Sequence, residues 1–193
     1  EDDPKAPKYL NTPQTLLYDK SRHVFGLSQA KDAIRKHDYS VIVEGNLDVA
    51  SSHQVGIAQV VATAGTAMTE HHLRALSRLS GNIRLAFDGD KAGIAATERS
   101  IPIAQDVGVD IKVVELPADV KDPDELIQRD VSEWQQAIDD AVPVVEWILK
   151  QYSLRENMES ASGKRAFTTA GLRVVRALHD PVEQEFYIKE IAH

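Results

Sequence analysis

Short hydrophobic runs alternate with amphipathic stretches through the first two thirds of the chain. Most positions in the runs are apolar, which is typical of parallel strands that are covered on both faces. They predict strands at residues 40–43, 58–62, 83–87 and 110–116. Apolar residues at helical spacing predict helices at residues 28–38, 47–54, 69–79 and 91–106, the last with a kink at Pro102.

Strands that alternate with helices at this spacing predict parallel βαβ units with right-handed crossovers. We therefore expect an α/β domain over residues 40–130, with a parallel four-strand sheet and flanking helices. Residues 1–39 begin with a proline-containing polar stretch and predict an N-terminal arm and a first helix that dock on this core. From residue 131 onward the apolar spacing is helical, which predicts a small all-helical subdomain over residues 131–193.

The composition narrows the class of protein. The chain has 193 residues, a formal net charge of −8 and no cysteine. Disulfide scaffolds and thiolate zinc sites are therefore excluded, and we expect no zinc. The acidic balance argues against bulk electrostatic binding of nucleic acid, which would have to be held locally. No apolar run approaches the roughly 18 to 20 residues that cross a bilayer, so we expect a cytoplasmic protein without membrane contact.

Acidic residues follow the predicted strands. In a parallel sheet these strand ends meet at one edge, where ligands of α/β proteins collect. Carboxylates that lie close together repel one another unless a cation intervenes. Mg²⁺ prefers oxygen ligands and binds phosphates at the same time, and two such ions can activate a hydroxyl and hold a leaving phosphate. We expect one or two Mg²⁺ ions, with Glu44, Asp88, Asp90 and Asp122 as ligands and Asp48 and Asp124 as supporting acids.

Two other interpretations of these acids remain open, and two more are excluded by the sequence. An Asp-Gly-Asp sequence is most often a solvated turn. The KDPDE stretch at residues 121–125 also suits a helix start, with Asp122 as the cap and Pro123 in the first turn. A calcium-binding hand that began at Asp88 would need an oxygen ligand at Ala92 and an acid at Arg99, so it is excluded. A phosphatase of the haloacid-dehalogenase type would need a threonine or similar residue at Ala92 and its motif on the first strand, and both are missing.

Four motifs together resemble the TOPRIM domain, and within that group the bacterial DnaG-type DNA primases. They are EGNLD at residues 44–48, VATAGTAMT at 61–69, FDGDKAG at 87–93 and KDPDE at 121–125. Two upstream stretches, PKYLNTPQT at 7–15 and YDKSRHVFGL at 18–27, are similar to the primases and not to TOPRIM proteins at large. The resemblance covers residues 7–130 closely, whereas the helical tail resembles the primase only in kind.

The resemblance implies a bacterial, nucleoid-associated enzyme that makes short RNA primers on single-stranded DNA from nucleoside triphosphates, with Mg²⁺ or Mn²⁺. Glu44 matches the family's metal ligand or acid–base group, and Asp88 and Asp90 match its metal-binding pair. These three are the catalytic residues that the resemblance implies. Its nucleotide site corresponds to Lys8, Asn11 and Lys20.

The chain also departs from the family pattern. Asn46 and Leu47 replace the tyrosine and methionine of the usual EGYMD. Similar primases begin with a zinc-binding module and a basic template-holding subdomain, and they end with a domain that binds the replicative helicase. We expect all three to be absent, and therefore a partial catalytic core with feeble or no primer synthesis alone. The alternatives are a TOPRIM nuclease or topoisomerase fragment, or a non-catalytic binding module.

Overall fold

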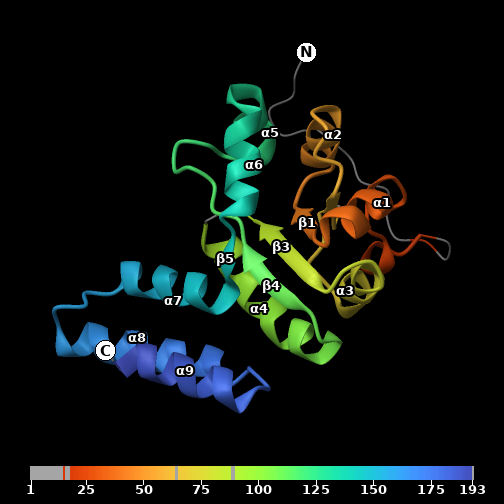
Figure 1. Ribbon diagram of the computed structural model, residues 1–193. Helices are drawn as coiled ribbons and strands as arrows, with labels where there is room; N and C mark the ends of the chain where they lie inside the picture. The colour runs from red at the N-terminus through yellow and green to blue at the C-terminus, as the bar shows by residue number, and fades with distance from the viewer. Residues whose placement is uncertain (1–14, 16–17, 64, 88–89, 193) are drawn as a thin grey trace.

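The computed structural model describes residues 15, 18–63, 65–87 and 90–192. Within these residues, five strands form one sheet in the order β2-β1-β3-β4-β5, with helices on both faces (Figure 1). The strands are β1 (Ser40–Val43), β2 (Val60–Ala62), β3 (Asn82–Ala86), β4 (Asp110–Val113) and β5 (Val142–Pro143). The predicted α/β architecture is confirmed.

The helices alternate with the first four strands and then continue to the C-terminus. Those of the first part are the 3₁₀ turn η1 (Lys20–Arg22), α1 (Leu27–His37), α2 (Asn46–Gln54), α3 (Glu70–Ser77) and α4 (Lys91–Val107). The later ones are α5 (Pro123–Arg129), α6 (Val131–Asp139), α7 (Val144–Arg155), α8 (Ala161–Val175) and α9 (Pro181–Ala192). Of the described helices, none is long and apolar enough to cross a membrane.

The four predicted strands are parallel, and the fifth is an addition that the sequence did not predict. β1 lies between β2 and β3, with Val43 opposite Ala62 of β2 and Ala86 of β3. β5 has two residues and pairs antiparallel with β4. Its Pro143 has no backbone N–H to donate, which suits a strand at the edge of a sheet. The sheet is therefore mixed, with a parallel core and one antiparallel edge.

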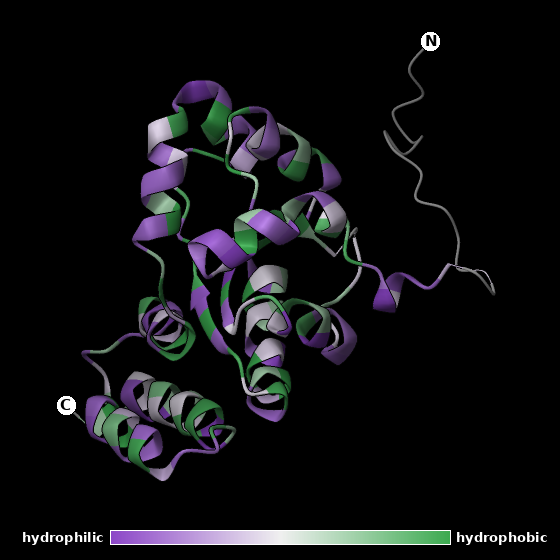
Figure 2. Cartoon of the chain, turned by 45° about the vertical axis from the view of Figure 1, so that its right-hand side comes forward, coloured by the Kyte–Doolittle hydropathy of each residue, from purple (hydrophilic) through white to green (hydrophobic). Residues whose placement is uncertain are grey.

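Each face of the sheet has its own hydrophobic core because side chains alternate along the strands. Ile42 of β1 belongs to one core, together with residues of α1, α3, α4 and α7. Val41 and Val43 belong to the other, together with residues of α2, α5 and α6. In Figure 2 the hydrophobic faces of these helices turn toward the sheet. This layering leaves the carboxyl ends of the strands at an edge between the two helix layers.

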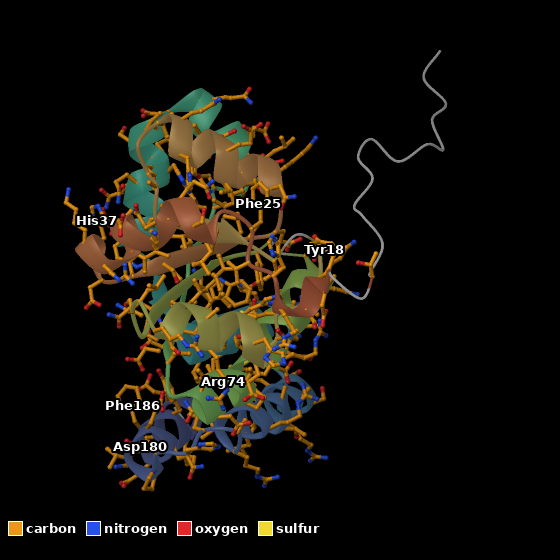
Figure 3. All side chains as sticks on the ribbon, turned by 90° about the vertical axis from the view of Figure 1, so that its right-hand side faces the viewer. Tyr18, Phe25, His37, Arg74, Asp180 and Phe186 are labelled. Carbon is orange, nitrogen blue, oxygen red and sulfur yellow. The ribbon has the colours of Figure 1, made fainter. Side chains whose placement is uncertain are left out.

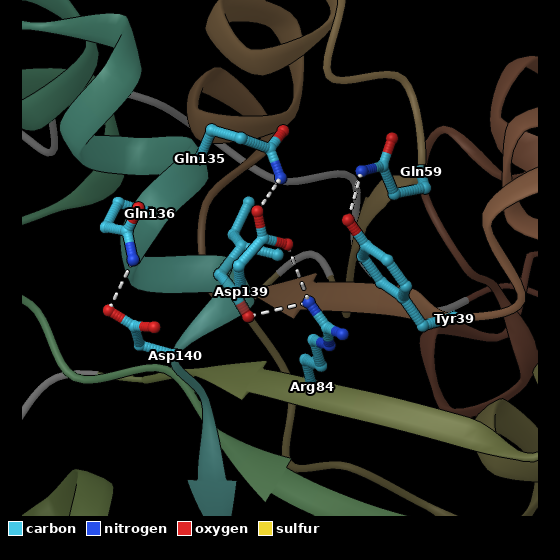
Figure 4. Close-up of polar contacts among 8 residues, drawn as sticks. Tyr39, Gln59, Arg84, Gln135, Gln136, Asp139 and Asp140 are labelled. Atoms are coloured by element: carbon cyan, nitrogen blue, oxygen red, sulfur yellow. Dashed lines mark hydrogen bonds and ion pairs between the residues drawn. The ribbon is translucent and has the colours of Figure 1, made fainter.

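Arg84 interrupts the apolar pattern of β3, and the structure accounts for it (Figure 4). Its guanidinium stacks 3.6 Å from the centroid of the Tyr39 ring. It also donates to the Ile138 carbonyl at 2.7 Å and pairs with Asp139 at 3.4 Å. Gln59 donates to the Tyr39 hydroxyl at 2.9 Å. Arg84 therefore fastens the C-terminal end of α6 to the sheet.

The segment before α1 docks on the free edge of β2. Phe25 donates to the Ala62 carbonyl at 2.8 Å and accepts from the Ala62 N–H at 3.1 Å. This isolated antiparallel bridge covers part of an edge that would otherwise carry unpaired backbone groups. Figure 3 labels Phe25 where this segment reaches the body of the protein.

Candidate functional site

The carboxyl ends of β1 and β3 lead into a cleft. Because these strands are parallel neighbours, the segments that follow them leave the sheet side by side. Glu44 follows β1 directly, and Asp90 stands immediately before α4, after the end of β3. Both residues are exposed, and both line a cleft of about 330 Å³. The structure thus brings two of the predicted acidic residues to one cavity.

The turn after β2 also lines this cleft. The Thr63 hydroxyl donates to the Thr66 carbonyl, and the Thr66 hydroxyl donates to the Thr63 carbonyl, each at 2.9 Å. Gly65, between them, has a φ of +71°, a left-handed conformation that favours glycine. The two reciprocal hydrogen bonds hold the turn in a compact shape next to the acids.

Asp90 is fixed in place because it caps α4. One of its carboxylate oxygens, Oδ1, accepts the Gly93 N–H at 2.7 Å. The residue is the N-cap of a 17-residue helix. This cap holds the Asp90 carboxylate at the wall of the cleft.

Arg99 lines the same cleft, and the sequence did not suggest it as a site residue. Ala92, Gly93 and Ala96 line the cleft from the same helix, and their small side chains leave open space along α4. Arg99 lies seven residues after Ala92, about 10 Å along the helix axis. It is exposed and forms no ion pair with any residue that the structure describes. The signal that could have identified Arg99 is the series of small residues at helical spacing, Ala92 and Ala96, that precedes it.

A second acidic group lies between α2 and α5. Asp48 is 8% exposed. Its Oδ2 accepts the Gly45 N–H at 3.1 Å, and its Oδ1 accepts the Asp124 N–H at 3.2 Å. Ser51 in turn donates a hydrogen bond to the Asp124 carboxylate. Asp48 therefore joins the start of α2 to the start of α5.

The electrostatics of this group differ from those of the cleft. Burial raises the pKa of Asp48 to about 6, and the negative charges of Asp122 and Asp124 act in the same direction. The hydrogen bonds that Asp48 accepts from two backbone N–H groups oppose the rise in its pKa but do not cancel it. Asp48 therefore titrates close to neutral pH.

Asp122 caps α5, as the helix-start interpretation of KDPDE predicts. Its Oδ1 accepts the Glu125 N–H at 2.8 Å, and Pro123 occupies the first turn. Neither Asp122 nor Asp124 lines the cleft of Glu44. Among the residues that the structure describes, no three His, Asp or Glu side chains gather closely enough to hold a metal ion. Asp88 lies outside the described residues.

Lys20 is held through its backbone. Its carbonyl accepts a hydrogen bond from His72 Nε2 at 2.9 Å, while His72 Nδ1 accepts the Thr69 N–H at 3.2 Å. The imidazole is therefore neutral with its proton on Nε2, and burial lowers its pKa. Lys20 does not line the cleft. The other two predicted nucleotide-binding residues, Lys8 and Asn11, lie outside the described residues.

The two departures from the family motif lie at the start of α2. Leu47 is 52% exposed. The Asn46 side-chain oxygen is buried and finds no hydrogen-bond partner among the described residues. Neither side chain lines the cleft, so the substitutions leave its described lining unchanged.

Two protein-family models match the chain. The model described as Toprim-like matches residues 41–127, and the DnaB-helicase binding domain of primase matches residues 145–193. The second match corrects our expectation that the chain has no segment of the helicase-binding kind. The residues that match this domain form α7, α8 and α9.

Curated relatives and solved structures agree with these matches. A DNA primase of Clostridium acetobutylicum is 36% identical over 192 residues, which cover 98% of this chain and 32% of that protein. The RNA polymerase domain of Mycobacterium tuberculosis primase DnaG superposes with a TM-score of 0.86 at 31% identity, covering 99% of this chain and 62% of that one. A DnaG primase catalytic domain bound to ssDNA superposes with a TM-score of 0.81 at 26% identity, covering 100% of this chain and 62% of that one.

These alignments include the helical tail, so the residues that match the helicase-binding model also belong to the region shared with the polymerase domain. The chain spans about a third of the length of the curated relatives that it matches. It belongs to the family of bacterial DnaG-type DNA primases.

Proposed function

We propose that this chain is part of the catalytic core of a DNA primase, a DNA-directed RNA polymerase that makes short RNA primers on single-stranded DNA. The observation that carries the proposal is that Glu44, Asp90 and Arg99 line one cleft at the carboxyl edge of the sheet. The similarity to primases over almost the whole chain supports it. A TOPRIM nuclease, a topoisomerase or a non-catalytic module is not favoured.

The donors in the cleft fit a hard divalent cation. Glu44 and Asp90 offer carboxylate oxygens in an exposed cavity where water can complete the coordination of Mg²⁺ or Mn²⁺. We propose Asp88, two residues before Asp90, as a third ligand, and Asp122 as an additional one through the oxygen that its helix cap does not use. Such a cation, as one ion or two, would neutralise triphosphate charge and lower the pKa of the attacking 3′-hydroxyl.

The described residues contribute positioning and charge. The Arg99 guanidinium can donate two parallel hydrogen bonds to phosphate oxygens at the end of the cleft away from Asp90. The Asp90 carboxylate is held in place by its hydrogen bond from Gly93, so little reorganisation is needed when substrate binds. Lys8, Asn11 and Lys20 are our proposed further nucleotide-binding residues. Asp48 and Asp124 support the cleft by fixing α2 against α5.

The proposed partners are single-stranded DNA, nucleoside triphosphates and a replicative helicase. The match of residues 145–193 to the helicase-binding model supports a contact through α7, α8 and α9. We further propose the division into an N-terminal arm (1–39), a TOPRIM domain (40–130) and a helical subdomain (131–193). A cytoplasmic, nucleoid-associated location follows from this assignment.

Binding of Mn²⁺ and nucleotide tests the proposal. Electron paramagnetic resonance measures free Mn²⁺ as the protein is titrated, first alone and then with ATP. We expect Mn²⁺ binding that ATP strengthens, and a large loss of both in Glu44→Gln. Asp32→Asn removes one charge from an exposed carboxylate on α1 and is the matched control. Equal binding by Glu44→Gln and the control would contradict the metal centre, and cleavage of labelled DNA with Mn²⁺ would favour a nuclease.

A further inference from the structure

The outer face of α8 is basic in an otherwise acidic protein. Residues 161–176 contain four basic residues and no acidic residue, whereas the whole chain carries a net charge of −8. A shallow groove of about 610 Å³ follows this face. It is lined by Ser162, Arg165, Ala166, Thr169, Ala170, Arg173 and Arg176. A basic stripe along one helix is the usual electrostatic footprint of a surface that binds a polyanion.

The opposite face of α8 is buried, so the direction of the basic face is fixed. Gly171 lies where α7, α8 and α9 approach one another closely. A Cβ at this position would come within 2.9 Å of both Leu149 of α7 and Ile191 of α9. Val174 and Val175 are 2% exposed and complete this contact. Rotation of α8 about its axis would expose these residues and is therefore unfavourable.

The arginines stand at helical spacing with small residues between them. Arg165, Arg173 and Arg176 line one face and span about 16 Å along the helix axis. Ala166 and Ala170 lie between them and leave the helix surface open. An extended phosphate backbone can approach the helix closely here, and the guanidinium groups of Arg165 and Arg176 can each donate two hydrogen bonds to a phosphate.

One of these arginines is held against α4, the helix that also lines the cleft. Arg173 pairs with Glu98 of α4 at 3.0 Å and donates to the Tyr152 hydroxyl at 3.1 Å. Glu98 is the residue before Arg99, which lines the cleft. The basic face of α8 therefore contacts α4 at the residue before Arg99. Arg165 and Arg176 form no ion pair within the part of the chain that the structure describes, so their charges remain available.

We propose that the basic face of α8, formed by Arg165, Thr169, Arg173 and Arg176, binds the phosphate backbone of the nucleic-acid strand whose end occupies the cleft. This proposal rests on the proposed function in one respect, that the cleft acts on a nucleic acid. It adds a second nucleic-acid contact, outside the TOPRIM domain, in a segment that matches a helicase-binding model. The contact does not depend on sequence, because it involves phosphates alone.

The salt dependence of DNA binding tests the proposal. Fluorescence anisotropy with a labelled single-stranded oligonucleotide compares the wild-type chain with the double variant Arg165→Gln/Arg176→Gln. The control, Arg35→Gln/Arg78→Gln, removes the same charge from exposed residues of α1 and the end of α3. The double variant should bind roughly tenfold more weakly near 0.1 M salt, and the slope of log Kd against log salt should fall by about 1.4, at ~0.7 per phosphate contact. Equal loss in the control, or no loss in the double variant, would overturn the proposal.

A second experiment locates the strand directly. Because the chain has no cysteine, a single cysteine can carry a thiol-attached photocrosslinker. Thr169→Cys places it in the groove, and Ser28→Cys places it on the exposed side of α1. We expect crosslinks to single-stranded DNA from position 169 and few from position 28. Crosslinks from position 169 to an acidic polyglutamate peptide, with none to DNA, would assign the face to a protein partner and overturn the proposal.

These outcomes are separable from those of the nucleotide experiment. If Mn²⁺ and ATP bind normally while the α8 variants lose no DNA affinity, the proposed function stands and the α8 contact is wrong. If Glu44→Gln leaves Mn²⁺ binding intact while the α8 variants lose DNA, the contact stands and the metal centre is wrong. The α8 variants change no residue of the cleft.

Discussion

The two acidic groups near the carboxyl edge of the sheet differ in how far they are exposed to solvent. Glu44 and Asp90 are exposed in a cleft. Asp48 is buried, and each of its oxygens accepts a backbone N–H. Asp124 accepts from the side chains of Ser51 and Gln128. The first group is open to solvent, whereas the second joins α2 to α5 through hydrogen bonds.

The difference shows that an acid near the start of a helix can have either of two roles. Where small residues such as Ala92 and Ala96 surround it, the carboxylate faces open space and can meet a ligand. Where two helices meet, as α2 and α5 do, the carboxylate satisfies their N-terminal N–H groups and joins them. Substitutions should therefore affect ligand binding in the first group and stability in the second.

The largest expected effect is that of Asp90→Asn on ligand binding. Asparagine can still cap α4 by accepting the Gly93 N–H, so the fold should be preserved while the charge is lost. We expect Mn²⁺ affinity to fall by at least ~10- to 100-fold, because loss of a direct ligand should cost no less than loss of a residue that only orients one. Paramagnetic resonance titration measures this loss.

Thermal unfolding of the same variant provides the control. The melting temperature of Asp90→Asn should stay close to that of the wild type when both are measured in EDTA. A large drop in melting temperature would mean that Asp90 is a structural residue like Asp48, and the contrast between the two groups would disappear.

The next effect is that of Asp48→Ala on stability. Removal of the carboxylate leaves the Gly45 and Asp124 N–H groups without their acceptors, at a cost of about 2 kcal/mol in the free energy of unfolding. Urea unfolding followed by circular dichroism measures the change. The matched variant Asp32→Ala removes an exposed carboxylate from α1 and should change stability by less than about 0.5 kcal/mol. Equal stability of the two variants would show that Asp48 does not join α2 to α5.

Much of the fold was predictable because its signals are local. Short, largely apolar runs predicted the four parallel strands, and the cap residue Asp122 with Pro123 predicted the start of α5. β5 escaped prediction because two residues, Val142 and Pro143, carry no periodic pattern. The role of Arg84 could not be predicted either. Only the approach of α6, more than 50 residues later, supplies the carbonyl that its guanidinium needs.

The candidate site was predictable in part for the same reason. Glu44 and Asp90 could be placed together because parallel strand ends share an edge. The bond between Asp48 and the backbone of Asp124 could not be predicted, since these residues are 76 positions apart and meet only when α2 packs against α5. Arg99 was missed because an arginine on a helix is most often solvated, and a cleft is visible only in three dimensions.

A third, smaller effect concerns pH. The pKa of Asp48 is raised in the folded state from 3.8 to about 6, so the folded protein binds this proton more tightly than the unfolded chain does. Its contribution to stability is therefore complete below about pH 4 and is lost as the pH rises through 6. We expect the stability of the wild type relative to Asp48→Asn to decline between pH 4.5 and 7. Urea unfolding in EDTA at several pH values measures it, and a difference that stays constant with pH would contradict the raised pKa.

The smallest effect is that of Ser51→Ala, which tests whether the second acidic group acts as a connected network. The substitution removes the hydroxyl that donates to the Asp124 carboxylate, a loss of about 1 kcal/mol. Alanine has a higher helix propensity than serine inside α2, which offsets up to ~0.5 kcal/mol of this loss. The double variant Ser51→Ala/Asp48→Ala should be less destabilised than the sum of the two single variants, because both act on Asp124. Simple additivity in urea unfolding would instead mean that the two contacts are independent, and that α5 is held mainly by the apolar residues beneath it.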